Sequence, residues 1–403
     1  MSINAEPSGL AESIRRALLP IDEARGLANS AYTDPALFDF EREHLMADSW
    51  VALAFEGDLP EPGFALPVDF MGLPLLLLKN SEGVISVFHN VCSHRGMMLV
   101  REPGVVQGSL RCPYHSWNYG LDGALRGTPH IGGVGIHQLD DFDREQHGLK
   151  TVRSHIWLGM VFVNLSGNAD AFAEFIRPVE TRWKGFTRAF DRLRSPVTGG
   201  SMELEVNCNW KLAVENYCEA YHLPWVHPGL NSYSPLDQHY NINDGDGVSG
   251  QGSLCYRLAE VAGHHLPQFP DWPSEQLQHA EYLSLYPNVL LGVQVDHVFA
   301  IILHPLAHDR TLESLQIFYV GDDAVADRYS DNREMVLNAW REVFAEDIFA
   351  VEGMQRGRRS PGFEGGVFSK VMDAPTHHFH RWVASLYAKG FSAPGKRAVT
   401  DRV

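Results

Sequence analysis

The chain has 403 residues and a formal charge of −17, with 44% hydrophobic and 21% charged residues. This composition is that of a folded globular protein, and its acidic balance argues against nucleic acid or an anionic membrane as a partner. No apolar run approaches the roughly 18 residues of a membrane span, and no signal segment is evident, so we expect a cytoplasmic protein. Five cysteines are too few for a disulfide scaffold, and twenty histidines are many for this length.

The first part of the chain is predicted to change from helix to strand near its forty-eighth residue. Residues 1–47 read as polar turns around short helices at 11–19 and 35–46, a segment expected to pack on the C-terminal domain. Residues 48–165 alternate short apolar runs with Gly and Pro turns, which is typical of a small all-β domain of hairpins. The runs expected to form strands are 74–78, 84–88 and 156–163.

Two fragments of this β domain carry cysteine and histidine at metal-ligand spacing. One contributes Cys92 and His94, and the other contributes Cys112 and His115, with seventeen residues between His94 and Cys112. Each would bring one thiolate and one imidazole to the tip of a loop. Such a set could hold zinc tetrahedrally, or a Rieske [2Fe-2S] cluster with both sulfurs on one iron and both imidazoles on the other. The spacing favours the cluster, because zinc sites usually pair their cysteines as Cys-x₂₋₄-Cys.

The second part of the chain, residues 166–403, is predicted to form a larger α+β domain. Helical patterns cover 171–190, 210–223 and 332–355, and strand-like runs lie at 283–291, 297–303 and 312–320. Strands flanked by helices in this order indicate an antiparallel sheet.

The predicted helix 210–223 carries acidic residues and a histidine near its end. Glu215, Glu219 and His222 follow at i, i+4 and i+7, which would place them on one face of the helix. His227 lies five residues further on, beyond a proline, where a bend could return it to the same point. Alone, this pattern is as consistent with an exposed polar face that carries two histidines by chance.

The predicted helix 332–355 places one carboxylate in an apolar row. The row, at spacings of three or four residues, is Val336, Trp340, Val343, Asp347, Val351 and Met354. A buried carboxylate is costly without a partner, so Asp347 should have one. It could pair with Arg341 or Arg356. It could instead join His222 and His227 in a triad that leaves open positions on non-haem Fe(II) for O₂.

These motifs resemble those of the α subunits of Rieske non-haem iron oxygenases, the ring-hydroxylating family. The two Cys/His loops match the family's Rieske domain. Met97 and Tyr114 stand where respiratory Rieske proteins have an extra cysteine pair, so no loop disulfide is expected. The resemblance spans about residues 45–360. It implies a small all-β Rieske domain and a larger helix-grip-like α+β catalytic domain.

The catalytic domain of the family has an acidic residue three positions before its first iron histidine and a second histidine five positions after it. Glu219, His222 and His227 match that spacing. The family's late acidic ligand lies in a Glu-Asp-x-x-x-x-Glu helix, which matches the segment that contains Asp347. The resemblance therefore implies a mononuclear Fe(II) held by His222, His227 and Asp347.

The resemblance also implies partners. In this family electrons pass from the cluster of one subunit to the iron of its neighbour, which implies a homotrimer. Glu219 would then bridge His94 or His115 of one subunit and an iron histidine of the next. The chain has no Gly-x-Gly-x-x-Gly after a strand and no further cysteine set. Electrons are therefore expected from a separate NAD(P)H-dependent reductase of the flavin or ferredoxin type, with O₂ and a small organic molecule as substrates.

The substrate is suggested by one residue type. A bridging Glu, where ring-dihydroxylating members usually have Asp, is similar to the oxygenases that act on carnitine and betaines. Trimethylammonium groups bind to aromatic ring faces, and the candidates for such a cage are Tyr217, Tyr221, Trp225, Tyr286 and Phe299. The alternatives are hydroxylation of an aromatic ring and, from a different class, an electron-transfer protein whose second domain has lost its iron.

Overall fold

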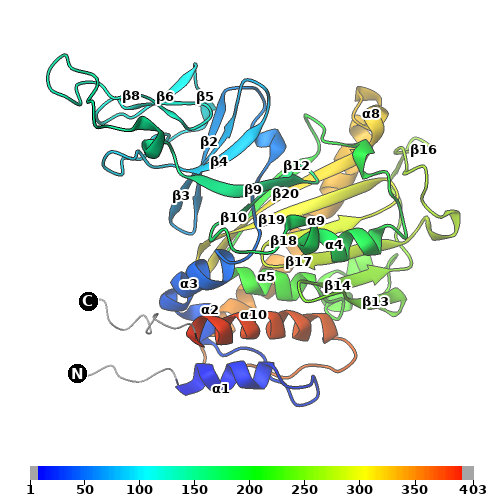
Figure 1. The fold of residues 1–403 in the computed structure, drawn as a ribbon. Coiled ribbons are helices and arrows are strands. Elements are labelled where there is room, and N and C mark those ends of the chain that lie inside the picture. Colours follow the sequence, from blue (N-terminus) through cyan, green and yellow to red (C-terminus); the bar gives the residue numbers. More distant parts are fainter. Residues whose placement is uncertain (1–7, 393–403) are drawn as a thin grey trace. The chain divides into compact units, whose positions relative to one another are not determined.

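The structure is a computed structural model that describes residues 8–392, and the chain divides into two compact units (Figure 1). One unit spans Trp50–Ala169, and the other combines Met1–Ser49 with Asp170–Val403. The first is all-β, apart from single helical turns, and the second is α+β.

Short antiparallel strands build the unit 50–169. Its larger sheet has the order β1-β10-β9-β4-β3-β2-β5, and a smaller sheet has the order β6-β7-β8. The strands are β1 (Val51–Phe55), β2 (Phe64–Phe70), β3 (Leu73–Lys79), β4 (Ile85–His89), β5 (Gly104–Val105), β6 (Ser109–Arg111), β7 (Asn118–Gly120), β8 (Leu125–Gly127), β9 (Thr151–Trp157) and β10 (Met160–Asn164). The strands predicted at 74–78 and 84–88 are confirmed as parts of β3 and β4, with a shift of one residue at the start of β4.

The single strand predicted at 156–163 is wrong. The segment is the turn of the β9–β10 hairpin, in which Trp157 pairs with Met160. Leu158 and Gly159 form the two-residue loop with φ values of +46° and +66°. Two-residue hairpin loops need positive φ, and they usually carry Asn-Gly or Asp-Gly, so a leucine at this position hides the turn in the sequence.

The second unit contains an eight-stranded antiparallel sheet of order β11-β20-β19-β18-β17-β14-β13, with β12 also paired to β20. Its strands are β11 (Leu193–Arg194), β12 (Ser201–Val206), β13 (His239–Asn243), β14 (Val248–Ser253), β17 (Ala280–Leu285), β18 (Val289–Val293), β19 (His297–Ala307) and β20 (Arg310–Val320). A small separate sheet pairs β15 (Glu260–Val261) with β16 (His264–His265). The runs predicted at 297–303 and 312–320 are confirmed, and the run 283–291 covers the β17–β18 hairpin.

Helices cover this sheet and include both ends of the described chain. They are α1 (Ser8–Ala17), α2 (Ser30–Thr33), α3 (Pro35–Glu41), a π-helix (Arg42–Met46), α4 (Phe172–Trp183), α5 (Trp210–Tyr217), α6 (Leu223–Val226), α7 (Pro228–Asn231), α8 (Gly321–Ala324), α9 (Ser330–Gly357) and α10 (Ala374–Ser392). Helices α1 and α10 lie side by side (Figure 1). Within residues 8–392, no helix is both long and apolar enough to cross a membrane.

The two faces of the large sheet contact different helices. On β19, the ring of Phe299 has its centroid 4.6 Å from that of Trp340 on α9. Tyr282 of β17 points to the same side, with its ring 5.8 Å from Trp340. We call this side the inner face. Glu281 directly precedes Tyr282, and successive side chains of a strand point to opposite faces. Glu281 therefore lies on the outer face, where Arg182 of α4 binds it at 2.7 Å.

Candidate active site

Two loops of the β unit have the same backbone hydrogen-bond pattern. The N–H groups of Cys92 and Cys112 each donate to the carbonyl five residues later, at 2.8 Å in both loops. The N–H four residues after each cysteine donates back to the cysteine carbonyl, at 3.0 Å and 2.9 Å. Gly96 and Ser116 occupy this fourth position, with φ values of +70° and +59°. The left-handed conformation at that residue closes both loops, so the two cysteines have equivalent backbone supports.

The loops bring the four predicted ligand side chains together. The ring centroids of His94 and His115 are 4.7 Å apart. Cys92 and Cys112 are buried and interact with one another, and burial raises the pKa of the Cys92 thiol. Nδ1 of His115 is buried without a hydrogen-bond partner. All five cysteines are free, so the loops contain no disulfide, as predicted. An unpartnered imidazole nitrogen and two buried thiols are donors that a metal–sulfur cluster fits.

The predicted helix 210–223 is wrong in its last turns. Helix α5 ends at Tyr217. Beyond it, the carboxylate of Glu219 accepts a hydrogen bond from the backbone N–H of Tyr221, a local contact that competes with helical pairing. Glu219 and His222 therefore share no helix face with Glu215, which lies in a buried ionic cluster.

The three residues of the predicted triad converge close to the end of α5. His222 and His227 belong to the segment after α5, and Asp347 lies in the middle of α9. One ligand atom from each lies within 4.8 Å of the others. Oδ1 of Asp347 is 3.0 Å from Nε2 of His227 and 3.6 Å from Nε2 of His222. Two imidazoles and one carboxylate on one side of a metal are the donor set of non-haem Fe(II) sites with open positions.

Carboxylates orient both histidines from behind. Nδ1 of His222 is 2.7 Å from Glu219, and Nδ1 of His227 is 2.8 Å from Glu346. Burial alone would lower the pKa of His227, but the hydrogen bonds to Asp347 and Glu346 raise it overall. These carboxylates therefore create a negative potential around the two rings, and this potential stabilises a metal cation bound between them.

No arginine within residues 8–392 pairs with Asp347, so the alternative of a pair with Arg341 or Arg356 is wrong. The amide of Asn216 donates to Oδ1 of Asp347 at 2.7 Å. Arg341 bonds a neighbouring asparagine on α9, and Arg356 pairs with Glu352. Asn216 was not predicted from the sequence. The feature of the sequence that could have identified it is its position one residue after Glu215, on the last turn of α5.

A buried ion pair anchors the start of α5. Lys211 and Glu41 are both fully buried and bond to one another. Glu41 also accepts a hydrogen bond from Nε1 of Trp210 at 2.8 Å and another from the hydroxyl of Tyr387. The N-terminal segment, α5 and α10 are thereby joined through one carboxylate.

A second ionic cluster surrounds Glu215. Its carboxylate accepts a hydrogen bond from the hydroxyl of Tyr32 and lies 3.2 Å from Nε2 of His380 and 3.5 Å from Arg358. Burial acts to raise the pKa of Glu215, but His380 and Arg358 lower it to about 2. The partners come from segments that are far away in the sequence, so the cluster could not be predicted from the residues near Glu215. The sequence indicated only that two charged residues, Lys211 and Glu215, lie within a buried helix.

The aromatic residues predicted for a substrate cage are separated in the structure. Tyr217 and Phe299 belong to an aromatic cluster between α5, α9 and the inner face, completed by Tyr282, Trp340 and Phe344. Tyr286 packs against α10 instead. Tyr221 and Trp225 are 44% and 70% exposed.

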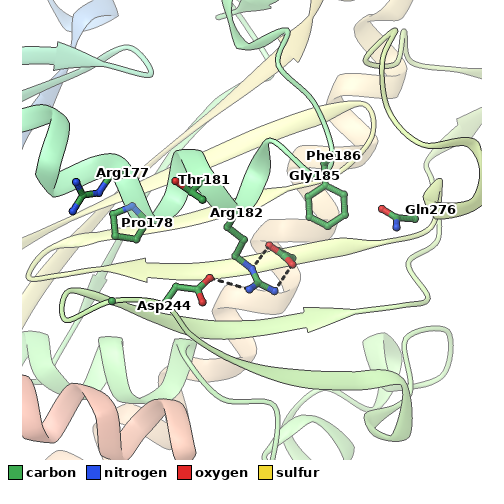
Figure 2. Close-up of a pocket in the computed structure, with 10 residues that line it drawn as sticks. Arg177, Pro178, Thr181, Arg182, Gly185, Phe186, Asp244 and Gln276 are labelled. Carbon is green, nitrogen blue, oxygen red and sulfur yellow. Dashed lines mark hydrogen bonds and ion pairs between the residues drawn. The ribbon is translucent and has the colours of Figure 1, made fainter.

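A pocket of about 680 Å³ lies in the α+β unit, beside α4 (Figure 2). The guanidinium of Arg182 crosses it, bound by Glu281 at 2.7 Å and by Asp244 at 2.9 Å. Two carboxylates already pair with Arg182, so its positive charge is not available to a ligand in the pocket. The pocket also contains none of the predicted ligand residues.

Comparison with known families decides what the two sites are. Residues 49–140 match the family model of the Rieske [2Fe-2S] domain, and residues 193–389 match that of the ring hydroxylating alpha subunit (catalytic domain). The chain belongs to the Rieske non-haem iron oxygenases, as a catalytic α subunit. This oxygenase accordingly uses a Rieske cluster and a mononuclear iron, and the structural-zinc interpretation is set aside.

Relatives of known activity cover most of the oxygenase. It is 25% identical over 368 residues to the carnitine monooxygenase oxygenase subunit of Escherichia coli (strain K12), covering 88% of this chain and 92% of that protein. It is 24% identical over 372 residues to the chloroplastic choline monooxygenase of Spinacia oleracea, covering 91% and 79%. Its fold is similar to that of the quaternary ammonium Rieske monooxygenase CntA in complex with L-carnitine, with a TM-score of 0.72 and 22% identity over 95% of this chain and 99% of that one.

Tyr119 contacts the sulfur of Cys92, one of the predicted cluster ligands. Its hydroxyl lies 3.2 Å from Sγ of Cys92 and 2.9 Å from Oγ of Ser93. A hydrogen bond to a ligand sulfur stabilises the reduced, more negative cluster. We therefore expect Tyr119→Phe to lower the midpoint potential by roughly 40 mV, the equivalent of about 1 kcal/mol for one electron. A redox titration followed by EPR measures this, with Tyr329→Phe in the α+β unit as the unshifted control. Equal potentials in the two variants would show that the hydroxyl does not act on the sulfur.

Proposed function

We propose that this oxygenase hydroxylates a C–H bond of a small quaternary ammonium compound of the carnitine, choline or betaine type, including N-methyl groups that are then released as aldehyde. The observation that carries the proposal is that relatives aligned over 88% and 91% of the chain are a carnitine and a choline monooxygenase. The fold itself does not favour one substrate class. Its TM-score is 0.72 with CntA and 0.71 with the naphthalene 1,2-dioxygenase of Rhodococcus sp..

We assign the metal groups to the residues that converge in each site. The cluster ligands are Cys92, His94, Cys112 and His115, and the iron ligands are His222, His227 and Asp347. When bound, the cluster supplies single electrons and the iron activates O₂.

The surrounding residues determine which atoms face the iron position. Because a carboxylate lies at Nδ1 of each histidine, the Nδ1–H tautomer leaves Nε2 of His222 and His227 as the free donor atom. The amide of Asn216 holds Oδ1 of Asp347 in place from the α5 side. The aromatic cluster of the inner face lies between α5 and α9, and ring faces of this kind suit a trimethylammonium group.

We propose that Glu219 connects the two metal sites across a trimer. Within the chain its carboxylate binds Nδ1 of His222. In a ring of three subunits, the same carboxylate would also receive a cluster histidine, His94 or His115, of the neighbouring subunit.

Glu219→Gln tests this role. We expect substrate turnover to fall by at least about 100-fold while iron and cluster contents stay at wild-type levels, because the electron path and the His222 contact are both altered. Stopped-flow oxidation of the reduced cluster by O₂ in the presence of substrate measures the transfer step. Glu203→Gln, on the exposed side of β12, is the matched control. Wild-type transfer in Glu219→Gln would contradict the bridging role.

We further propose an external NAD(P)H-dependent reductase as the electron source and a cytoplasmic location, where such a reductase operates. Ring hydroxylation of an aromatic compound is the second candidate function, since the fold is about as similar to a naphthalene 1,2-dioxygenase as it is to CntA.

One screen separates the two candidates. The reconstituted oxygenase, supplied with a surrogate reductase, is offered carnitine, γ-butyrobetaine, choline and glycine betaine against benzoate and naphthalene. Product formation is followed together with NADH oxidation. We expect coupled turnover with at least one quaternary amine, and turnover restricted to the aromatic compounds would overturn the proposal.

A further inference from the structure

Glu313 is a carboxylate on the inner face of the large sheet, and no predicted role includes it. It pairs in register with Leu303 of β19, four residues after Phe299 pairs with Ile317. The register is unbroken between these pairs, so Leu303 and Glu313 point to the same side as Phe299, toward α5 and α9.

The level of Glu313 along the sheet coincides with that of the iron triad. Helix α9 touches Phe299 through Trp340 at one end, and Glu352 bonds Asn207 beside the Val206–Thr311 pair at the other. Between these two contacts β20 covers roughly 20 Å and α9 covers about 18 Å. Positions at the same fraction of the way along the two elements therefore lie next to one another. Asp347 therefore lies over the part of β20 that contains Glu313.

The Glu313 carboxylate has no partner among the described residues. No hydrogen bond or ion pair reaches it within residues 8–392, although its side chain is only partly exposed. Burial, together with the nearby Asp347 carboxylate, raises the pKa of Glu313 to about 8, so the group holds a proton at neutral pH until a positive charge binds beside it. A side chain in this position would ordinarily be paired with Lys or Arg, or replaced by an apolar residue.

A quaternary ammonium ion has the chemistry to pair with a carboxyl group that lacks a cationic partner. Such a cation has no N–H to donate, so it is recognised by negative potential and by aromatic faces, without directional hydrogen bonds. A cationic residue beside Glu313 would cancel the potential that attracts the substrate. Without a cationic neighbour, Glu313 releases its proton to solvent when a cation binds beside it, and the resulting carboxylate holds that cation near the iron triad, where its C–H groups would react.

We propose that Glu313 is the counter-ion of the substrate's quaternary ammonium group and thereby selects cationic substrates over neutral ones of the same shape. The inference rests on the proposed function. Glu313 is a specificity residue for that reaction and holds no metal.

The test compares each quaternary ammonium compound with an isostere in which an uncharged carbon replaces the ammonium nitrogen. The probes are choline against 3,3-dimethylbutan-1-ol, and γ-butyrobetaine against 5,5-dimethylhexanoate. Dissociation constants are measured by calorimetry on the metal-loaded oxygenase under anaerobic conditions. The proteins are wild type, Glu313→Gln and Glu313→Asp, with Glu203→Gln as the control for loss of one exposed negative charge from the neighbouring strand.

The wild type and the Glu203→Gln control should bind the cation of at least one pair at least 10-fold more tightly than its isostere. Glu313→Gln should lose about 10- to 100-fold of its affinity for the cation and little for the isostere, at unchanged iron and cluster content. Glu313→Asp should retain part of the preference, because the charge remains. An unchanged preference in Glu313→Gln would overturn the role of Glu313. Absence of quaternary amine binding in the wild type would overturn the proposed function, and the inference with it.

Discussion

Asp347→Ala is expected to abolish oxygenase turnover, with a loss of more than about 100-fold, while the visible and EPR spectra of the Rieske cluster stay unchanged. Oδ1 of Asp347 is the point where the contacts of His222, His227 and Asn216 meet. Its removal leaves two imidazoles alone to hold the iron, and the loss of even one outer partner of a metal ligand typically costs 10- to 100-fold in affinity or activity. Iron and product are measured per cluster.

The matched control for this variant is Glu342→Ala, an exposed carboxylate on the same helix. It should retain iron, cluster and turnover. Full iron content and turnover in Asp347→Ala would show that the triad is assigned to the wrong residues. Loss of the cluster signal as well would instead indicate a general failure of folding.

Lys211→Met is expected to destabilise the catalytic unit by about 3–5 kcal/mol, since it leaves the buried Glu41 carboxylate without its cation. Trp210 and Tyr387 would still donate hydrogen bonds to Glu41, but neither carries a compensating charge. Because α5 starts at Trp210, the loss should also disorder the helix that presents Asn216. Calorimetric unfolding and iron retention measure the two effects.

Replacing both partners should restore most of this stability. In the double variant Lys211→Met/Glu41→Leu no buried charge remains unpaired, and apolar replacements of ion pairs are often neutral or stabilising. The exposed Lys184→Met serves as the single-charge control and should be near wild type. A double variant as unstable as Lys211→Met would show that the ion pair is not the source of the loss.

The sequence was most informative where ligand chemistry depends on short spacings. Cys92 and His94, like Cys112 and His115, lie within four residues of one another, so local loop geometry is enough to predict their association. Asp347 was identified because a carboxylate in an apolar stripe needs a partner. The stripe itself was only partly right, because Met354 is 36% exposed while the adjacent Gln355 is buried, and Phe344 is buried where Val343 was predicted.

Features that depend on irregular local contacts or on distant pairing could not be read in this way. The helix 210–223 was extended too far because the hydrogen bond of Glu219 to the Tyr221 backbone is invisible to periodicity. Tyr32 and Glu215 are 183 positions apart. The orientation of Glu313 follows only from its register with Leu303, and the sequence of β20 alternates too weakly to show which side of the strand is inner.

A single-turnover experiment tests the central claim most directly. The oxygenase is reduced without reductase, freed of excess reductant, and mixed with O₂ and one quaternary amine from the carnitine, choline and betaine series. Product and the EPR signal of the reduced cluster are then quantified in the same sample. We predict that hydroxylated product, or the aldehyde derived from it, forms in proportion to the cluster oxidised. Cluster oxidation without product from any quaternary amine, together with product from an aromatic substrate, would contradict the account.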